Sequence, residues 1–177
     1  MDLILRTCAA DRTSRNGFRW PESGPVVAPD WDPEPRCGGG LHGLLWGEGD
    51  GGLLSWSESA CWLVAEVDPA EVVPLGGKVK FPRAVVVYCG DRAGATSYLA
   101  ARAPAGRILA IVGGTATAGY RGTATAGDYG TATAGDYGTA TAGDYGTATA
   151  GEGGEIRVSW WDNSASRRRT AIGYVGE

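Results

Sequence analysis

The chain has one histidine, His42, which lies five positions after Cys37 in the segment CGGGLH, and these two side chains are its first candidates for chemistry. A thiol and an imidazole within hydrogen-bond distance can act as a nucleophile and its general base. The plainer interpretation is an ordered loop in which His42 is hydrogen-bonded under Trp46. We favour that interpretation and predict no catalytic residue. A small enzyme centred on Cys37 and His42 is kept as a second alternative.

Metal binding is the other chemistry that these residue types allow, because thiolate and imidazole ligands suit tetrahedral zinc. The four cysteines are Cys8, Cys37, Cys61 and Cys89, and no two of them form a C-x-x-C pair. Reduced thiols are expected, since the N-terminus does not read as a secretion signal. We therefore predict no metal site and no cofactor, and we interpret Cys61 and Cys89 as small core residues in apolar strands.

Two glycine-rich segments, 38–43 and 47–52, match the pattern G-x-G-x-x-G. Neither joins a strand to a helix, as a dinucleotide site requires, so we attribute both matches to composition. The formal net charge of −4 disfavours a nucleic-acid partner. No apolar run approaches the roughly 18 residues of a membrane span. These observations predict a cytoplasmic protein with neither a nucleic-acid nor a membrane partner.

The elements that would position any site begin with a repeat. From Gly114 to Gly153 the chain reads GTATAGYR, then GTATAGDY three times, then GTATAGEG. Thr-Ala-Thr-Ala alternates with period two, which is the pattern of a strand, and threonine is β-branched and suits one. Gly-Asp-Tyr-Gly is typical of a turn. Each octad is therefore predicted to be one short strand and one tight corner.

A lone strand with two alanines cannot bury enough surface to fold, whereas stacked identical units can. Eight residues are too few for one circuit of a solenoid, so we predict a two-sided β-solenoid with two octads per coil. Alanine then fills a thin core and threonine faces solvent, because the reverse arrangement would bury hydroxyls without partners.

Alternation of octads between two faces sorts the threonines of the predicted solenoid surface. One face carries Thr115, Thr117, Thr131, Thr133, Thr147 and Thr149, and the other carries Thr123, Thr125, Thr139 and Thr141. The corners place Tyr129 and Tyr145 on one edge and Tyr137 on the opposite edge. A tyrosine ladder offers apolar area at little cost in side-chain entropy, so we predict a weak homodimer through these tyrosines.

The whole sequence is predicted to form three regions. These are an α+β domain with a mainly antiparallel sheet over residues 1–111, the octapeptide solenoid over 112–154, and a C-terminal capping β-hairpin over 155–177. In the first region, 21–37 is proline-rich loop or extended chain. The other expected elements are strands at 61–67, 71–75, 78–81, 84–89 and 107–112, and a helix within 91–103. The strand at 84–89 is predicted to be central and buried. In the hairpin, Trp160 and Trp161 are expected to cover the last alanine layer.

Two resemblances follow from these motifs. The segment Cys37–His42 resembles, with one extra glycine, the C-x-x-G-L/F-H motif of uncharacterised actinobacterial, phage and prophage proteins, which carry short Gly/Ala/Thr repeats like GTATAGDY after that domain. That family implies an association with phages but no activity. The Thr-x-Thr pattern of residues 114–153 is similar to the repeats of ice nucleation proteins and insect antifreeze proteins, which implies binding of ice.

Taken together, the sequence favours a non-enzymatic structural or interaction protein that presents a repetitive threonine-rich surface and is phage- or prophage-associated. Binding of ice or ordered water through the Thr-x-Thr ladders is the alternative.

Overall fold

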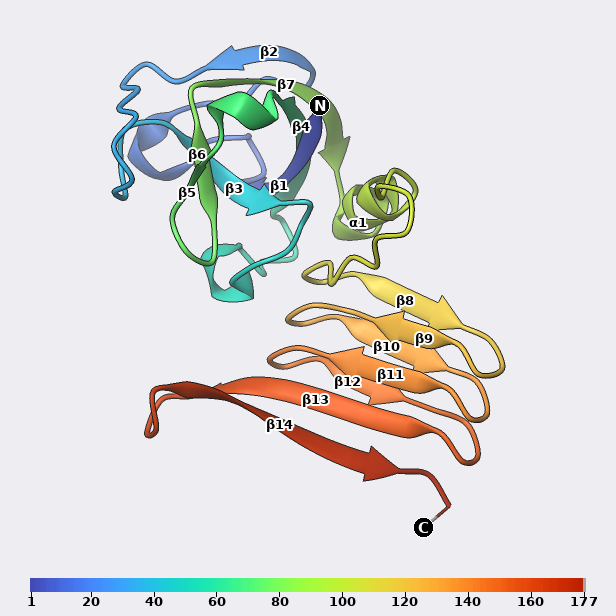
Figure 1. Ribbon diagram of the computed structural model, residues 1–177. Helices are drawn as coiled ribbons and strands as arrows, with labels where there is room; N and C mark the ends of the chain where they lie inside the picture. Colours follow the sequence, from blue (N-terminus) through green and yellow to red (C-terminus); the bar gives the residue numbers. More distant parts are fainter. Residues whose placement is uncertain (177) are drawn as a thin grey trace. The chain divides into compact units, whose positions relative to one another are not determined.

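The fold is given by a computed structural model that describes residues 1–176. Contacts divide the chain into two compact units, an N-terminal unit (Met1–Pro104) and a C-terminal unit (Ala105–Glu177), shown in Figure 1. Residues 105–111 group with the repeat in this division. No helix among the described residues is long and apolar enough to cross a membrane.

The N-terminal unit is built on a seven-stranded sheet in the order β2-β7-β4-β1-β3-β6-β5, with antiparallel pairs throughout. Its strands are β1 (Asp2–Cys8), β2 (Gly24–Val27), β3 (Leu41–Leu45), β4 (Cys61–Val67), β5 (Val73–Pro74), β6 (Val79–Phe81) and β7 (Arg83–Gly90). Short 3-10 turns occur at Arg15–Gly17, Gly51–Leu53 and Pro69–Glu71.

The centre of this sheet is β1, which the sequence analysis did not identify. Leu3, Ile4 and Leu5 are at most 3% exposed. The strand predicted as central, β7, lies second from the edge, so that prediction is wrong. Its residues alternate, with Val85 41% exposed and Val86 2% exposed, because only one face of β7 is covered.

The predicted helix is present as α1 (Arg92–Ala100) and follows β7 directly. Asp91 begins it by accepting a hydrogen bond from the Gly94 amide at 2.7 Å, an N-cap that satisfies one of the free amides of the first turn. Ala95 and Leu99 are fully buried and pack the helix against the unit.

The C-terminal unit contains two β-sheets whose parallel strands pair at a constant offset of sixteen residues, so a β-rich repeat is confirmed. One sheet holds β8 (Thr115–Ala118), β10 (Thr131–Ala134) and β12 (Thr147–Thr149). The other holds β9 (Thr123–Thr125), β11 (Thr139–Ala142), β13 (Glu155–Asp162) and β14 (Arg167–Tyr174). Figure 1 shows these short strands stacked along the unit.

The core between these sheets is made of alanine. Ala132 and Ala140 have no exposed surface, and they cluster with Ala124, Ala126 and Ala134. The space between the two sheets is thin and holds only methyl side chains. Alternation with period two, rather than large apolar residues, therefore indicates which residues of the repeat are buried.

Each corner of the repeat contains a residue with a positive φ, a conformation that small or polar residues usually adopt. Tyr129, Tyr137 and Tyr145 occupy that conformation, each with φ close to 56°. The glycines serve close approach instead. A Cβ on Gly135 would lie 2.9 Å from the backbone of Gly119, one coil earlier, so any larger residue would push the coils apart.

Residues 107–112, predicted as a strand, are not one. Leu109, Ile111 and Val112 are buried, and the Ile111 carbonyl accepts hydrogen bonds from the amides of Gly127 at 3.0 Å and Gly114 at 3.1 Å. These are bonds to the corners of the first coil rather than a ladder, because the segment closes the end of the alanine core with larger side chains.

At the other end, β13 pairs in parallel with β11 and antiparallel with β14, forming the expected hairpin. Ile156 and Val158 take the register positions of Ala140 and Ala142. Trp160 and Trp161 are 39% and 49% exposed, so the expectation that they cover the last alanine layer is wrong. Ile156 and Val158 are half-buried at those register positions.

Candidate functional site

The threonine ladders are the most regular surface of the chain. In the β8-β10-β12 sheet, Thr131 pairs with Thr115 and Thr147, and Thr133 pairs with Thr117 and Thr149. We call this set the six-threonine face. Thr131 is exposed and Thr133 is half-buried, while Ala132 between them points into the core.

The second ladder is shorter, and charged residues follow it. In β9 and β11, Thr139 pairs with Thr123 and Thr141 pairs with Thr125. The next strand places Glu155 and Arg157 at the same register positions, and these two side chains form an ion pair. The set Thr123, Thr125, Thr139 and Thr141 is called the four-threonine face, and its regular pattern ends at that ion pair.

Both ladders present the same chemistry to water. Strand geometry spaces threonines of one strand by about 7 Å and neighbouring rungs by about 4.8 Å. Among residues 1–176, none of these ten threonine hydroxyls hydrogen-bonds to another protein group. Each therefore offers a hydroxyl for water beside a methyl group, in a two-dimensional array whose spacing is set by the backbone.

A feature that the sequence analysis missed holds the coils in register. Asp128 Oδ1 accepts a hydrogen bond from the amide of Asp144 at 2.9 Å, and Asp136 Oδ1 accepts one from Glu152 at 3.0 Å, each sixteen residues later. Asp144 accepts in the same way from the amide of Trp161 at 2.9 Å. Aspartate at the same position of the three GTATAGDY octads is the signal for this role, since carboxylates often accept hydrogen bonds from exposed amides at corners.

The tyrosines that were predicted as an interface lie on the two edges of the repeat. The rings of Tyr129 and Tyr145 stack with centroids 5.0 Å apart, and the rings of Tyr120 and Tyr137 meet edge-on at 5.8 Å. Tyr145 is 82% exposed and Tyr137 is 58% exposed. The sequence analysis did not include Tyr120 in this set.

The Cys37–His42 pair is not assembled for catalysis. Both residues line one pocket of the N-terminal unit, but no hydrogen bond joins their side chains among the described residues. The Cys37 thiol is exposed and instead accepts a hydrogen bond from Lys78 Nζ at 3.2 Å, which lowers the thiol pKa. Burial lowers the pKa of His42, which favours the neutral imidazole.

The His42 imidazole forms a hydrogen bond with the backbone of Gly40. His42 Nε2 is buried and has no hydrogen-bond partner in the part of the chain that the structure describes. Trp46 is buried, and its backbone amide donates a hydrogen bond to the Leu3 carbonyl at 2.7 Å. The buried Lys80 also orders the loop, because its Nζ donates hydrogen bonds to the carbonyls of Arg36 and Gly38.

The other cysteines are structural by position. Cys8 is buried, and Cys61 and Cys89 are half-buried on neighbouring strands with their sulfur atoms 3.1 Å apart. Burial raises the pKa of Cys89 to about 12, which suppresses thiolate reactivity. No group of three or more potential metal ligands occurs within residues 1–176.

No family model and no solved structure matches. The chain is similar to the ice nucleation protein of Pseudomonas syringae (45% identity over 102 residues, 56% of this chain and 9% of the relative) and to that of Xanthomonas campestris pv. translucens (44% over 104 residues, 58% and 7%). Ice nucleation protein InaU of Pantoea ananas is 41% identical over 99 residues, 55% of this chain and 10% of the relative.

These relatives match about half of this chain, which spans at most about a tenth of their length. The eight matching relatives come from Pseudomonas, Xanthomonas, Pantoea and Enterobacter, so they give no support to the actinobacterial and phage resemblance. Their names describe ice nucleation and not a catalysed reaction. The comparisons therefore support the likeness of this chain to ice nucleation proteins.

Proposed function

We propose that this chain binds ice, or the ordered water that precedes it, through the six-threonine face. The observation that carries the proposal is the in-register array of Thr-x-Thr rungs on β8, β10 and β12. Similarity to ice nucleation proteins at 41–45% identity supports it independently. This proposal replaces the general structural role as the preferred function, and it needs no catalytic residue.

The physical basis is a rigid template for water. Each threonine hydroxyl exchanges hydrogen bonds with water, and each methyl group excludes water from one side, so the positions left for the first water layer repeat with the ladder. The backbone hydrogen bonds between strands, together with the hydrogen bond from the Asp144 amide to the Asp128 carboxylate at a corner, fix the spacing of the rungs. A water layer ordered in this way has less entropy to lose on joining a crystal.

We assign the activity to the six-threonine face rather than to the four-threonine face. The former has three complete rungs, whereas the latter is followed by Glu155 and Arg157. Charged side chains hold water in their own hydration geometry, so a charged rung interrupts the template. The supporting fold is a two-sided β-solenoid with two octads per coil, which the sixteen-residue pairing supports.

Weak self-association through the tyrosine edges belongs to the same proposal. Three rungs make a small array, and side-by-side association of two copies would enlarge it. The exposed Tyr145 and Tyr137 offer apolar area for such a contact.

The test is inhibition of ice recrystallisation by the wild-type chain and by paired variants. Thr131→Lys with Thr133→Lys interrupts the middle rung of the six-threonine face and should abolish inhibition. The matched control, Thr139→Lys with Thr141→Lys, places the same charges on the four-threonine face and should retain most of it. Circular dichroism confirms that both variants fold. Equal activity of the first variant and the wild type would refute the assignment.

A finer pair separates the two parts of the threonine side chain. Thr131→Val keeps the methyl groups and removes the hydroxyl, while Thr131→Ser does the reverse. Loss of activity in both supports a combined hydroxyl and methyl template. Full activity in both would contradict it.

A further inference from the structure

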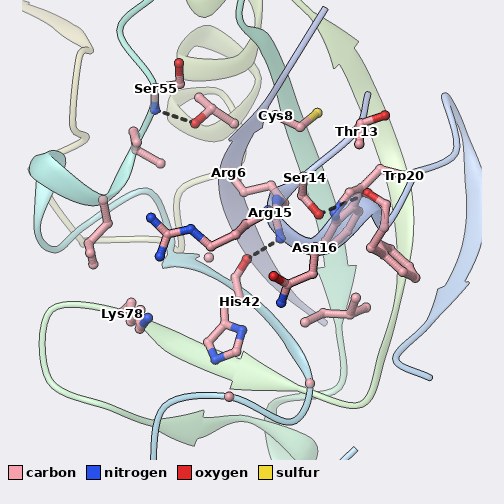
Figure 2. Close-up of a pocket in the computed structure, with 18 of the residues that line it drawn as sticks. Arg6, Cys8, Thr13, Ser14, Arg15, Asn16, Trp20, His42, Ser55 and Lys78 are labelled. Atoms are coloured by element: carbon pink, nitrogen blue, oxygen red, sulfur yellow. Dashed lines mark hydrogen bonds between the residues drawn. The ribbon is translucent and has the colours of Figure 1, made fainter. Parts of the chain in front are cut away.

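The N-terminal unit contains a pocket of about 880 Å³ that the ice-binding proposal does not use. It lies between β1, the 3-10 turn at Arg15–Gly17, the glycine-rich segment leading into β3, and the segment after Gly51. Figure 2 shows Arg6, Arg15, His42 and Lys78 around this space. The volume is within the range of small-molecule sites and far exceeds that of a bare ion.

Positive charge dominates the lining. Arg6, Arg15 and Lys78 contribute cations, and Asp30 is the one acidic residue among the described lining residues. The Asp30 carboxylate accepts a hydrogen bond from the Gly40 amide at 3.1 Å. Within residues 1–176 none of the three cations forms an ion pair with a carboxylate. This accumulation runs against the net charge of −4 of the whole chain.

Arg6 is the most unusual of these cations. Its Nη1 donates to the His42 carbonyl at 3.0 Å, and its guanidinium lies 4.3 Å from the centre of the Trp20 ring. Its Nε is buried without a hydrogen-bond partner in the described chain, and burial lowers the Arg6 pKa to about 10. A buried cation without a counter-charge is costly, and an anion in the pocket would relieve that cost.

Two further polar atoms of the same lining are buried without partners. Trp20 is 1% exposed, and its Nε1 has no acceptor among the residues described. His42 Nε2 is the third atom of this kind, and these three are all the buried unpartnered side-chain atoms found within residues 1–176. Buried polar groups are normally satisfied, so three unpartnered polar atoms in residues that line one pocket make its surroundings unusually polar for a protein interior.

Another part of the wall is apolar. Phe18, Leu41 and Leu44 line the pocket beside the cations, so the occupant has an organic body as well as a charge. We propose that this pocket binds a small organic molecule that carries a phosphate or carboxylate group. The anion faces Arg6, Arg15 and Lys78, and the body lies against the apolar wall.

Three ring compounds test the proposal: phenyl phosphate, benzoate and the neutral phenol. Binding to the full chain is followed by the chemical shift of the Trp20 indole N–H in two-dimensional NMR, assigned with a Trp20→Phe variant. We expect saturable shifts with at least one of the two anions and none with phenol at the same concentrations. The comparison of phenyl phosphate with benzoate identifies which anion the site prefers.

The variants avoid the buried Arg6, whose replacement risks unfolding the unit. Arg15→Ala with Lys78→Ala removes two cations at the pocket, and each lost charge-assisted hydrogen bond should weaken anion binding by about tenfold. The matched control, Arg102→Ala with Arg167→Ala, removes two cations that do not line the pocket and should bind as the wild type does. Phenol binding as tightly as the anions, absence of saturable shifts, or equal affinity of the two double variants would each overturn the proposal.

Discussion

Ala132 and Thr131 are neighbours on β10 with opposite orientations, and replacing each by aspartate tests the inside and outside of the repeat. Ala132 has no exposed surface and lies in register between Ala116 and Ala148, whereas Thr131 is exposed. An aspartate at 132 has neither space nor a hydrogen-bond partner in the alanine core. An aspartate at 131 points into water.

The expected magnitudes differ widely. Burying an unpaired carboxyl group costs about 4 kcal/mol even after it takes up a proton. An exposed substitution usually changes the free energy of unfolding by about 0.5 kcal/mol or less. For a unit of this size, Ala132→Asp should therefore lower the melting temperature of the repeat by on the order of 20 °C, against a few degrees for Thr131→Asp.

The assay is thermal unfolding followed by far-UV circular dichroism at several pH values. Burial raises the pKa of an aspartate at 132 above its unfolded value of about 3.9. Its destabilising effect should therefore be largest above the folded pKa and shrink as the pH falls toward about 3.9, below which both states are protonated. Equal melting temperatures for the two variants at neutral pH would refute the assignment of the two faces.

Three further outcomes follow from the contacts. Asp144→Ala removes the acceptor of the Trp161 amide and should destabilise the repeat by about 1–3 kcal/mol, measured by denaturant unfolding against Asp144→Asn, which keeps one acceptor oxygen and should lose less. Lys78→Ala should raise the Cys37 pKa, so alkylation by iodoacetamide near neutral pH should slow; an unchanged rate would contradict the hydrogen bond between them. Tyr145→Ala should abolish concentration-dependent association in sedimentation, and a wild-type chain that stays monomeric at high concentration would count against the dimer.

The repeat was predictable because its energetics are local and identical in each unit. Alternation of Thr131 and Ala132 specifies which side is buried, and the octad is too short to close a coil alone. The conformations at the corners were not predictable from the same letters. The glycines are required because the neighbouring coil lies too close for a side chain. The positive φ is taken instead by Tyr129, Tyr137 and Tyr145. Which corner residue takes the positive φ depends on how the coils pack, and residue preferences alone do not encode that packing.

The N-terminal unit shows the opposite case. Its central strand, β1, carries the short apolar run Leu3–Leu5, and its neighbours β4 and β3 come from about 40 to 60 residues later in the chain. A strand defined by distant partners has little local signal. The pocket was missed for the same reason, since Arg6, Trp20 and His42 become neighbours through that sheet. His42 was identified from the sequence, but its place in this pocket was not.

The size of the threonine array bears on which ice-related activity to expect. A template lowers the barrier to freezing only when the water that it orders approaches the size of a stable ice embryo, whereas adsorption to a crystal that already exists has no such threshold. The six-threonine face has three rungs, and the part of this chain that matches the ice nucleation proteins covers only 7–10% of their length. Inhibition of recrystallisation should therefore be measurable at this size, while raised freezing temperatures require arrays joined edge to edge. The exposed tyrosines Tyr137 and Tyr145 lie on the edges of the repeat, so the self-association that we propose would join arrays in this way.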